Sequence, residues 1–256
     1  MAANGRGGTF TARKIAYCAV MTALLTGAQM ALGFVSGVEI VTLLLACFSA
    51  CAGIISGVIT AVCFCLLRCF IWGFYPNVIV LYLVYFPAFA LIFGLLGHIR
   101  DDLFSRAHIA IFIAVNVLLL TVACTALCCC ILKLIKISRL YADTVYAMMW
   151  AIFALSAALD VAFNALFLSV RLKRCSGAAL RIFMYTSVAC VCTICFTLLD
   201  DVISPLMLGM TEKTALAYFY ASFMAMLPQT ICTLVTLSTL SAPVTYIMHR
   251  CLRQNY

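Results

Sequence analysis

Apolar stretches long enough to cross a lipid bilayer follow one another along nearly the whole sequence. A bilayer-spanning helix needs about 20 consecutive apolar residues. Of the 256 residues, 67% are hydrophobic and only 9% are charged, whereas a soluble domain is about half apolar and a quarter charged. The sequence therefore excludes a water-soluble globular protein and predicts an all-α, polytopic membrane bundle.

Turn-forming and charged residues divide the apolar sequence into eight predicted helices. The stretch 38–72 is too long for one crossing at about 1.5 Å per residue, and Gly53 near its middle predicts a bend. The predicted helices then cover 15–35, 38–52, the stretch from this bend to Trp72, 78–97, 107–132, 144–170, 181–204 and 214–248. We expect short tails at 1–13 and 251–256 around a single transmembrane domain, 14–250.

The basic residues lie between these apolar stretches, so the net charge of +8 does not indicate a nucleic-acid partner. Eight crossings place eleven Lys and Arg on the side of the termini, four on the other side, and Arg68 in the membrane. Basic residues concentrate on the cytoplasmic side of membrane proteins. The asymmetry therefore predicts that both termini are cytoplasmic. The eleven basic residues on the side of the termini are Arg6, Arg13, Lys14, Arg100, Arg106, Arg171, Lys173, Arg174, Arg181, Arg250 and Arg253. The four on the other side are Lys133, Lys136, Arg139 and Lys213.

Polar side chains within membrane helices are costly, so each is a candidate functional residue. Glu39 fits a capping box with Ser36 and equally fits a substrate contact. Arg68 lies one turn before the outer end of its helix, where it either reaches the headgroups or binds an anionic group in a pocket. Gln229 is either a packing contact or a ligand contact.

Two adjacent carboxylates, Asp200 and Asp201, stand at the outer C-terminal end of their predicted helix. An acid at this end opposes the helix dipole, so capping does not explain them. Either both reach water near Pro205 or one of them enters a pocket. Outer aromatic residues form either an interfacial belt or an aromatic-lined cleft, and they include Trp72, Tyr75, Tyr82 and Tyr218.

A second polar group is expected near the membrane midplane. Asp160 and Asn164 are one turn apart on one helix, and Asn116 lies on the preceding helix. The three side chains form either an interhelical hydrogen-bond cluster or part of a proton or cation relay.

Enzyme signatures are missing from the sequence. It contains no H-E-x-x-H, G-x-S-x-G or Walker A motif. Fourteen of its sixteen cysteines lie in the apolar stretches, where free Cys acts as a small apolar residue. We expect a protein that is not an enzyme and that holds no cofactor and no metal.

Several segments resemble the substrate-binding S component of energy-coupling factor (ECF) transporters. They are 13–31 with its Ala19-x-x-x-Ala23 pair, Gly37-Val-Glu-Ile-Val-Thr-Leu-Leu44, Phe70-Ile-Trp-Gly-Phe74, Leu198-Leu-Asp-Asp-Val-Ile-Ser-Pro205, Ala217-Tyr-Phe-Tyr-Ala-Ser222 and Pro228-Gln229.

The resemblance implies a protein that binds one micronutrient at the outer face. It also implies docking, through the Ala19 and Ala23 face, on a transmembrane coupling subunit driven by two cytoplasmic ATPases. The family usually has six membrane helices, so the extra pair at 107–174 would be an insertion. We place the pocket in the outer half, between the loops at 37–39 and Trp72–Asn77 and the facing helix ends near Asp200, Asp201, Tyr218 and Gln229. The two carboxylates there oppose their helix dipole, and the nearby aromatic side chains supply stacking surfaces.

The leading hypothesis is thus a substrate-capture subunit of an ATP-driven importer in a bacterial plasma membrane. An ion-coupled secondary transporter is the competing hypothesis, since such carriers need a titratable group near the midplane and Asp160 would supply it. A third hypothesis is a membrane-embedded structural or assembly protein without a ligand.

Overall fold

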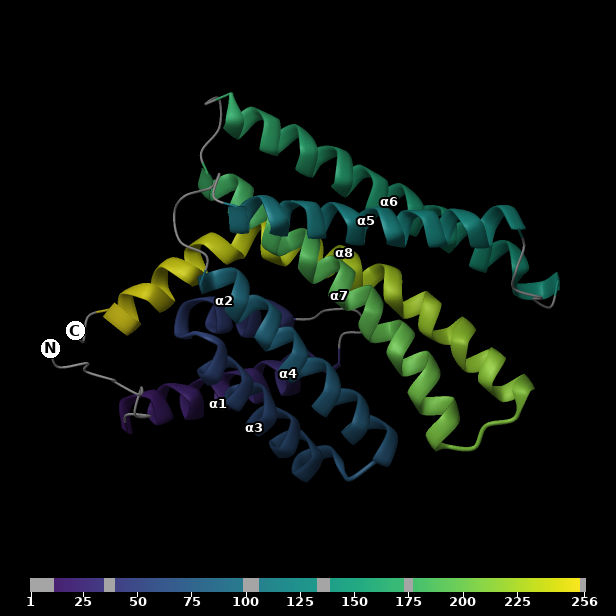
Figure 1. The fold of residues 1–256 in the computed structure, drawn as a ribbon. Helices are drawn as coiled ribbons and strands as arrows, with labels where there is room; N and C mark the ends of the chain where they lie inside the picture. Colours follow the sequence, from purple (N-terminus) through teal and green to yellow (C-terminus); the bar gives the residue numbers. More distant parts are fainter. Residues whose placement is uncertain (1–11, 35–39, 99–105, 133–138, 173–176, 254–256) are drawn as a thin grey trace, which may run out of the picture.

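The computed structural model describes residues 12–34, 40–98, 106–132, 139–172 and 177–253. All regular structure in these ranges is helical, and seven of the helices are long and apolar enough to cross a membrane. The chain is therefore a polytopic membrane helical bundle, as predicted (Figure 1). Its helices are α1 (Ala12–Leu32), α2 (Val41–Ala52), α3 (Ile54–Trp72), α4 (Pro76–His98), α5 (Arg106–Leu132), α6 (Arg139–Arg171), α7 (Gly177–Met207) and α8 (Glu212–Arg253).

The predicted break at Gly53 separates α2 from α3. Gly53 has φ 89°, a conformation that glycine adopts without the steric cost that other residues meet. Its backbone N–H donates to the carbonyl of Ser49 at 3.0 Å and closes the last turn of α2. With 12 residues, α2 is about 18 Å long, which is shorter than the roughly 30 Å hydrocarbon core of a bilayer.

The start of α1, the end of α2, the start of α3 and the end of α8 lie at one end of the bundle, here named the terminal end. The Tyr17 hydroxyl donates to the carbonyl of Cys251 at 3.4 Å, which joins α1 to α8. The Cys18 thiol contacts the carbonyl of Ser56 at 3.6 Å, and the Cys51 thiol contacts that of Thr245 at 4.0 Å.

The opposite end of the bundle holds the α3–α4 and α7–α8 connections. Asn77 in the first turn of α4 hydrogen-bonds to Ser204 near the end of α7, and Tyr218 near the start of α8 hydrogen-bonds to Asp200. The helices α1 to α4, α7 and α8 therefore alternate in direction along the bundle, and α2 covers only part of its length.

The core is built around α4 and α7, and α7 is the most buried of the long helices. Phe89 and Phe93 of α4 are almost fully buried, and the Phe93 ring packs edge-on against Tyr185 of α7 at 5.7 Å between centroids. Glycines allow α4 to approach α2 and α3 closely. A Cβ atom on Gly94 would lie 2.8 Å from the Cα of Ile54, and one on Gly97 would overlap the backbone of Ala50.

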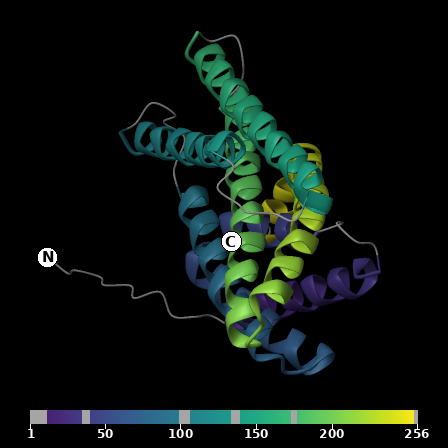
Figure 2. The same cartoon turned by 90° about the vertical axis from the view of Figure 1, so that its right-hand side faces the viewer.

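The hairpin of α5 and α6 lies on one side of the bundle, above α7 and α8 in both Figure 1 and Figure 2. Its backbone approaches α7 and α8 but, within the described ranges, not α1 to α4. Phe112 of α5 stacks on Phe167 of α6 with ring centroids 3.9 Å apart. The pair therefore lies at the periphery of the bundle, and its buried residues, such as Leu119 and Phe163, join the hydrophobic cluster formed by α4 and α7.

The outward-facing sides of the helices carry large apolar side chains such as Val20, Phe70 and Val161, which are more than 60% exposed. Such surfaces match a lipid environment. All fifteen cysteines in the described part of the chain are free thiols, including Cys192 and Cys195 of the lone C-x-x-C sequence.

Candidate functional site

A chain of hydrogen bonds centred on Asp200 joins three helices at the opposite end. Ser204 Oγ donates to Asp200 Oδ1 at 2.5 Å, and the Tyr218 hydroxyl donates to Asp200 Oδ2 at 2.6 Å. Asn77 Nδ2 donates in turn to Ser204 Oγ at 2.9 Å. We call Asn77, Asp200, Ser204 and Tyr218 the Asp200 cluster, and three of these four residues were predicted to share a site.

Local sequence explains how Asn77 reaches this position. α3 ends at Trp72, and the next residue, Gly73, has φ 103°, a left-handed conformation that favours glycine. Pro76 then begins α4, since proline suits the first helical position, where its missing N–H costs nothing. Asn77 follows immediately and so lies in the first turn.

The predicted end of the seventh helix at Ser204 was wrong. α7 continues to Met207 with Pro205 inside it. Proline lacks only the N–H that would bond to the carbonyl four residues earlier, so it removes one bond without stopping the last turn. Asp200 and Ser204 are four residues apart and so share one face of α7.

The two carboxylate oxygens of Asp201 are buried, although the residue as a whole is only partly buried. Neither of its carboxylate oxygens has a partner. Ser222 of α8 faces it, but the Ser222 hydroxyl donates to the carbonyl of Phe219 at 2.8 Å. The alternative in which both aspartates simply reach water is therefore wrong for Asp201. A buried carboxylate without a donor is costly, which makes Asp201 a candidate binding group for a cation.

Arg68 lies over aromatic rings instead of extending alone to the headgroups. Its guanidinium is 4.0 Å from the ring centroid of Tyr82 and 5.7 Å from that of Trp72. This geometry is a cation–π interaction. The buried Nε atom has no hydrogen-bond acceptor. Arg68 therefore keeps donor capacity for an anionic group.

Aromatic contacts connect Arg68 with the Asp200 cluster. The Tyr82 ring lies 5.8 Å from the ring of Phe196, and Phe196 precedes Asp200 by one turn of α7. Arg68 of α3 and the two aspartates of α7 therefore lie at the same end of the bundle, and the Tyr82 ring of α4 connects them.

The remaining predicted site residues do not join this group. Gln229 is eleven residues beyond Tyr218 on α8, which is about 16 Å along the helix. Tyr75 is 60% exposed, with its ring beside Gly73. Glu39, and with it the predicted capping box, lies outside the described residues.

Near the midplane, the predicted interhelical contact forms between the two amides only. Asn164 Nδ2 donates to Asn116 Oδ1 at 2.6 Å and joins α6 to α5. The Asp160 side chain takes no part, because Asn164 contacts only its backbone carbonyl, and Asp160 Oδ1 is buried without a partner. The packing interpretation is confirmed for Asn116 and Asn164 and wrong for Asp160.

Ala19 and Ala23 are exposed within the chain. They line an apolar groove of about 420 Å³ between α1 and α3, together with Cys18 and Thr22 of α1 and Ile59 of α3. Among the residues that the structure describes, only α1 and α3 line this groove.

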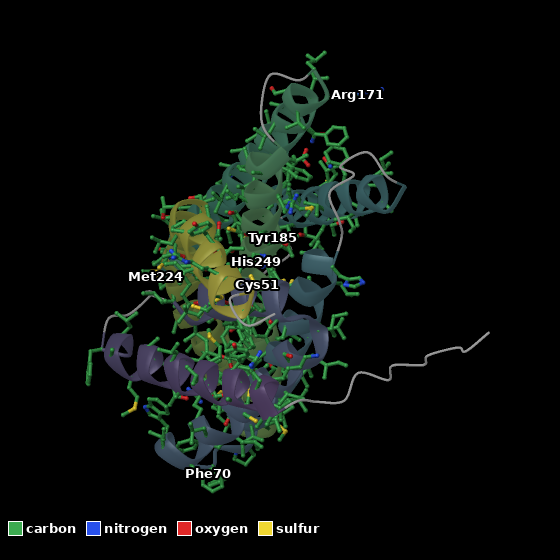
Figure 3. All side chains as sticks on the ribbon, turned by 90° about the vertical axis from the view of Figure 1, so that its left-hand side faces the viewer. Cys51, Phe70, Arg171, Tyr185, Met224 and His249 are labelled. Carbon is green, nitrogen blue, oxygen red and sulfur yellow. The ribbon has the colours of Figure 1, made fainter. Side chains whose placement is uncertain are left out.

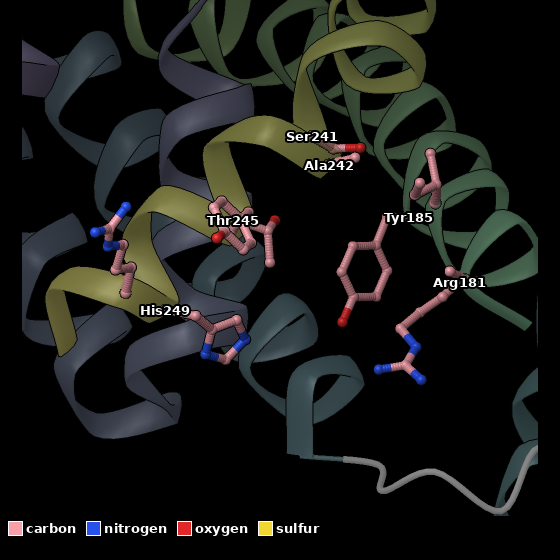
Figure 4. Close-up of a pocket in the computed structure, with 10 residues that line it drawn as sticks. Arg181, Tyr185, Ser241, Ala242, Thr245 and His249 are labelled. Atoms are coloured by element: carbon pink, nitrogen blue, oxygen red, sulfur yellow. The ribbon is translucent and has the colours of Figure 1, made fainter. Parts of the chain in front are cut away.

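A cavity at the terminal end was not predicted from the sequence. It has a volume of about 720 Å³ and lies between α7 and α8 (Figure 4). Its signal in the sequence was helical spacing, with Arg181 and Tyr185 four residues apart on α7 and Ser241, Thr245 and His249 at the same interval on α8.

Among the described residues, no group of three or more His, Cys, Asp or Glu side chains is close enough to hold a metal ion. No protein family, curated protein or solved structure shows a significant match to this chain.

Proposed function

We propose that this chain is the membrane-embedded substrate-capture subunit of an ATP-driven importer for a micronutrient-like small molecule. In this proposal it lies in a bacterial plasma membrane, its terminal end faces the cytoplasm, and the opposite end faces outward. The observation that carries the proposal is the gathering of Arg68, Asp200 and Asp201 at that one end. Intramembrane charges are expensive and serve substrate recognition more often than packing.

The partners of these charges differ in a way that supports ligand binding. Asp200 already accepts two hydrogen bonds, from Ser204 and Tyr218, so its role is to hold α7, α8 and α4 together. Asp201 has no donor and Arg68 Nε has no acceptor. A small polar or zwitterionic substrate would satisfy both groups, with Trp72 and Tyr82 as stacking surfaces.

The arrangement of the helices also supports the proposal. Without α5 and α6, six helices remain, which is the number usual in the S component family that the sequence resembles. The peripheral packing of the α5–α6 hairpin is the arrangement expected of an inserted pair. The open groove beside Ala19 and Ala23 would receive a helix of the coupling subunit, because small residues let helices approach closely.

The test is ligand binding by the purified full chain. A panel of vitamins, nucleobases and amino acids is screened by thermal shift, and the best ligand is titrated into wild type and Arg68→Gln. We expect at least about tenfold weaker binding by Arg68→Gln, since a hydrogen bond to a charged group contributes about 1.5–3 kcal/mol. The matched control is Arg171→Gln, which removes the same charge from an exposed residue at the end of α6. If Arg68→Gln binds the ligand as tightly as the control variant does, the ligand site lies elsewhere.

A capture subunit also requires its partners. Purification from native membranes in mild detergent should recover a membrane coupling protein and two ATPases together with the chain. Recovery of the chain alone, with transport driven by an ion gradient in proteoliposomes, would contradict the proposal.

One observation favours the ion-coupled carrier as a second candidate. Asp160 Oδ1 is buried without a partner on α6, as expected of a site that takes up a proton or a cation. The Asp160→Asn variant separates the two hypotheses, because a capture subunit keeps its substrate affinity and a proton-coupled carrier loses coupled transport. Absence of any thermal shift across the panel would favour a structural or assembly protein.

A further inference from the structure

The cavity between α7 and α8 opens at the terminal end, far from the Asp200 cluster. Figure 3 looks onto this end and shows Tyr185, His249 and Cys51 near its centre. The volume of about 720 Å³ falls within the range of small-molecule sites, about 300–1,000 Å³. The proposed substrate site does not involve this cavity.

Hydrogen-bond donors line the cavity on two helical faces. Arg181 and Tyr185 come from α7, and Ser241, Thr245 and His249 come from α8. Figure 4 shows the Tyr185 phenol between the side chains of Arg181 and His249. The imidazole supplies an N–H donor in either charge state, and the guanidinium supplies several donors.

The deepest polar residues of the cavity are almost inaccessible from outside. Tyr185 is 7% exposed and Ser241 is 2% exposed. The Ser241 hydroxyl has no hydrogen-bond partner, whereas the neighbouring Thr230, Thr236 and Thr239 hydroxyls donate to backbone carbonyls of α8. Because Ser241 lines the cavity, its hydroxyl is an unused donor in the cavity wall.

The described residues that line the cavity include basic side chains and no acidic ones. The basic ones are Arg181, His249 and Arg250. Arg181 is the fifth residue of α7, where a cation opposes the positive end of the helix dipole. An anion at this position would interact favourably with both the arginine and the helix N-terminus.

We propose that this cavity binds the phosphate group of an anionic molecule. Donors that converge from two helices suit the several oxygens of a tetrahedral phosphate, whereas a planar carboxylate needs only one bidentate arginine. The position at the end of the bundle favours the headgroup of an anionic phospholipid, since basic pockets between membrane helices bind such headgroups. A soluble phosphate compound shares the same chemistry.

The experiment compares these two sources with the full chain in neutral detergent. Native mass spectrometry counts bound short-chain phosphatidylglycerol, with phosphatidylcholine of equal chain length as the lipid without net charge. Thermal shifts with inorganic phosphate, against chloride at equal ionic strength, test the soluble source. The variants are Arg181→Gln, the milder Arg181→Lys and His249→Gln. The matched control is Lys14→Gln, which removes a basic residue that lines a different cavity at the same end.

We expect phosphatidylglycerol to bind in preference to phosphatidylcholine, and Arg181→Gln to weaken this binding at least about tenfold while Lys14→Gln leaves it unchanged. A response to inorganic phosphate with the same dependence on Arg181 would support the site with a soluble occupant. The proposal is overturned if neither probe depends on Arg181, or if Lys14→Gln weakens binding as much as Arg181→Gln. His249→Gln and Arg181→Lys keep the test decisive if Arg181→Gln does not fold.

Discussion

The Tyr218 hydroxyl donates to Asp200 Oδ2 at 2.6 Å and fastens the start of α8 to the end of α7. The same carboxylate accepts from Ser204, which in turn accepts from Asn77 of α4. One acid therefore sets the spacing of three helices at the end where the substrate is proposed to bind. Loss of the Asp200 carboxylate would first change the positions of these helices and only through them affect recognition of the substrate.

Removing the Tyr218 hydroxyl should destabilise the protein with its helices otherwise intact. The Tyr218→Phe variant loses one hydrogen bond to a charged group, and we expect its free energy of unfolding in mixed micelles to fall by about 1–2 kcal/mol. Tyr75→Phe is the control, because Tyr75 is exposed at the same end of the bundle. A loss of equal size in both variants would show that the hydrogen bond contributes nothing specific.

The contact between Asn116 and Asn164 should contribute a measurable coupling between α5 and α6. A double-mutant cycle with Asn116→Ala and Asn164→Ala is expected to give a coupling energy of about 0.6–1.7 kcal/mol, the range found for hydrogen bonds between membrane helices. Asp160→Ala combined with Asn116→Ala should give no coupling, because the Asp160 side chain does not reach this contact. Strong coupling to Asp160 would restore the three-residue cluster.

Close packing of α4 against α3 predicts a large effect of adding side-chain volume at Gly94. The Gly94→Val variant would press on the backbone of Ile54, and overpacking of this kind costs about 1–3 kcal/mol. Gly27→Val is the control, since a Cβ atom on Gly27 meets nothing within 4 Å. Thermal unfolding of the two purified variants checks the difference, and equal melting temperatures would contradict the packing described for α4.

The Ala19–Ala23 groove predicts a defect in assembly and none in ligand binding. Ala19→Leu or Ala23→Leu fills the groove, so we expect recovery of the coupling subunit to fall about tenfold or more. Ala16→Leu is the matched control, since Ala16 is exposed on α1 but does not line the groove. Co-purification from native membranes, scored together with ligand affinity, checks this. Unchanged assembly in both groove variants would exclude this face as the docking surface.

Local sequence was sufficient to predict the helices and the grouping of Asn77, Asp200 and Tyr218. Apolar length sets each crossing, Gly53 marks the bend, and the short α7–α8 connection brings Tyr218 back beside Asp200 whatever the rest of the fold does. Ser204 was not predicted as a site residue, although it lies one helical turn from Asp200, because a serine next to a proline is also typical of a turn.

Features that depend on how helices rotate about their axes were not predictable. An apolar helix in lipid has no polar face to show which side is buried, so the direction of Asp160 away from Asn116 and the burial of the Asp201 carboxylate could not be deduced. Helix length alone likewise could not place α5 and α6 at the periphery. Proline near a helix end also gave the wrong boundary for α7, since the chain tolerates one missing bond there.

The shortness of α2 has a consequence for where polar groups or water must lie in this protein. Ala50 lies against Gly97 near the end of α4, so the first turn of α2 stands about halfway along α4, roughly 14 Å from that level. The leading N–H groups of a helix have no partners within it, and hydrocarbon cannot supply any. Because Val41, Thr42 and Leu43 of that turn are buried among the other helices, these N–H groups must find polar partners or enclosed water inside the protein, at a depth where the outer faces of the bundle meet hydrocarbon.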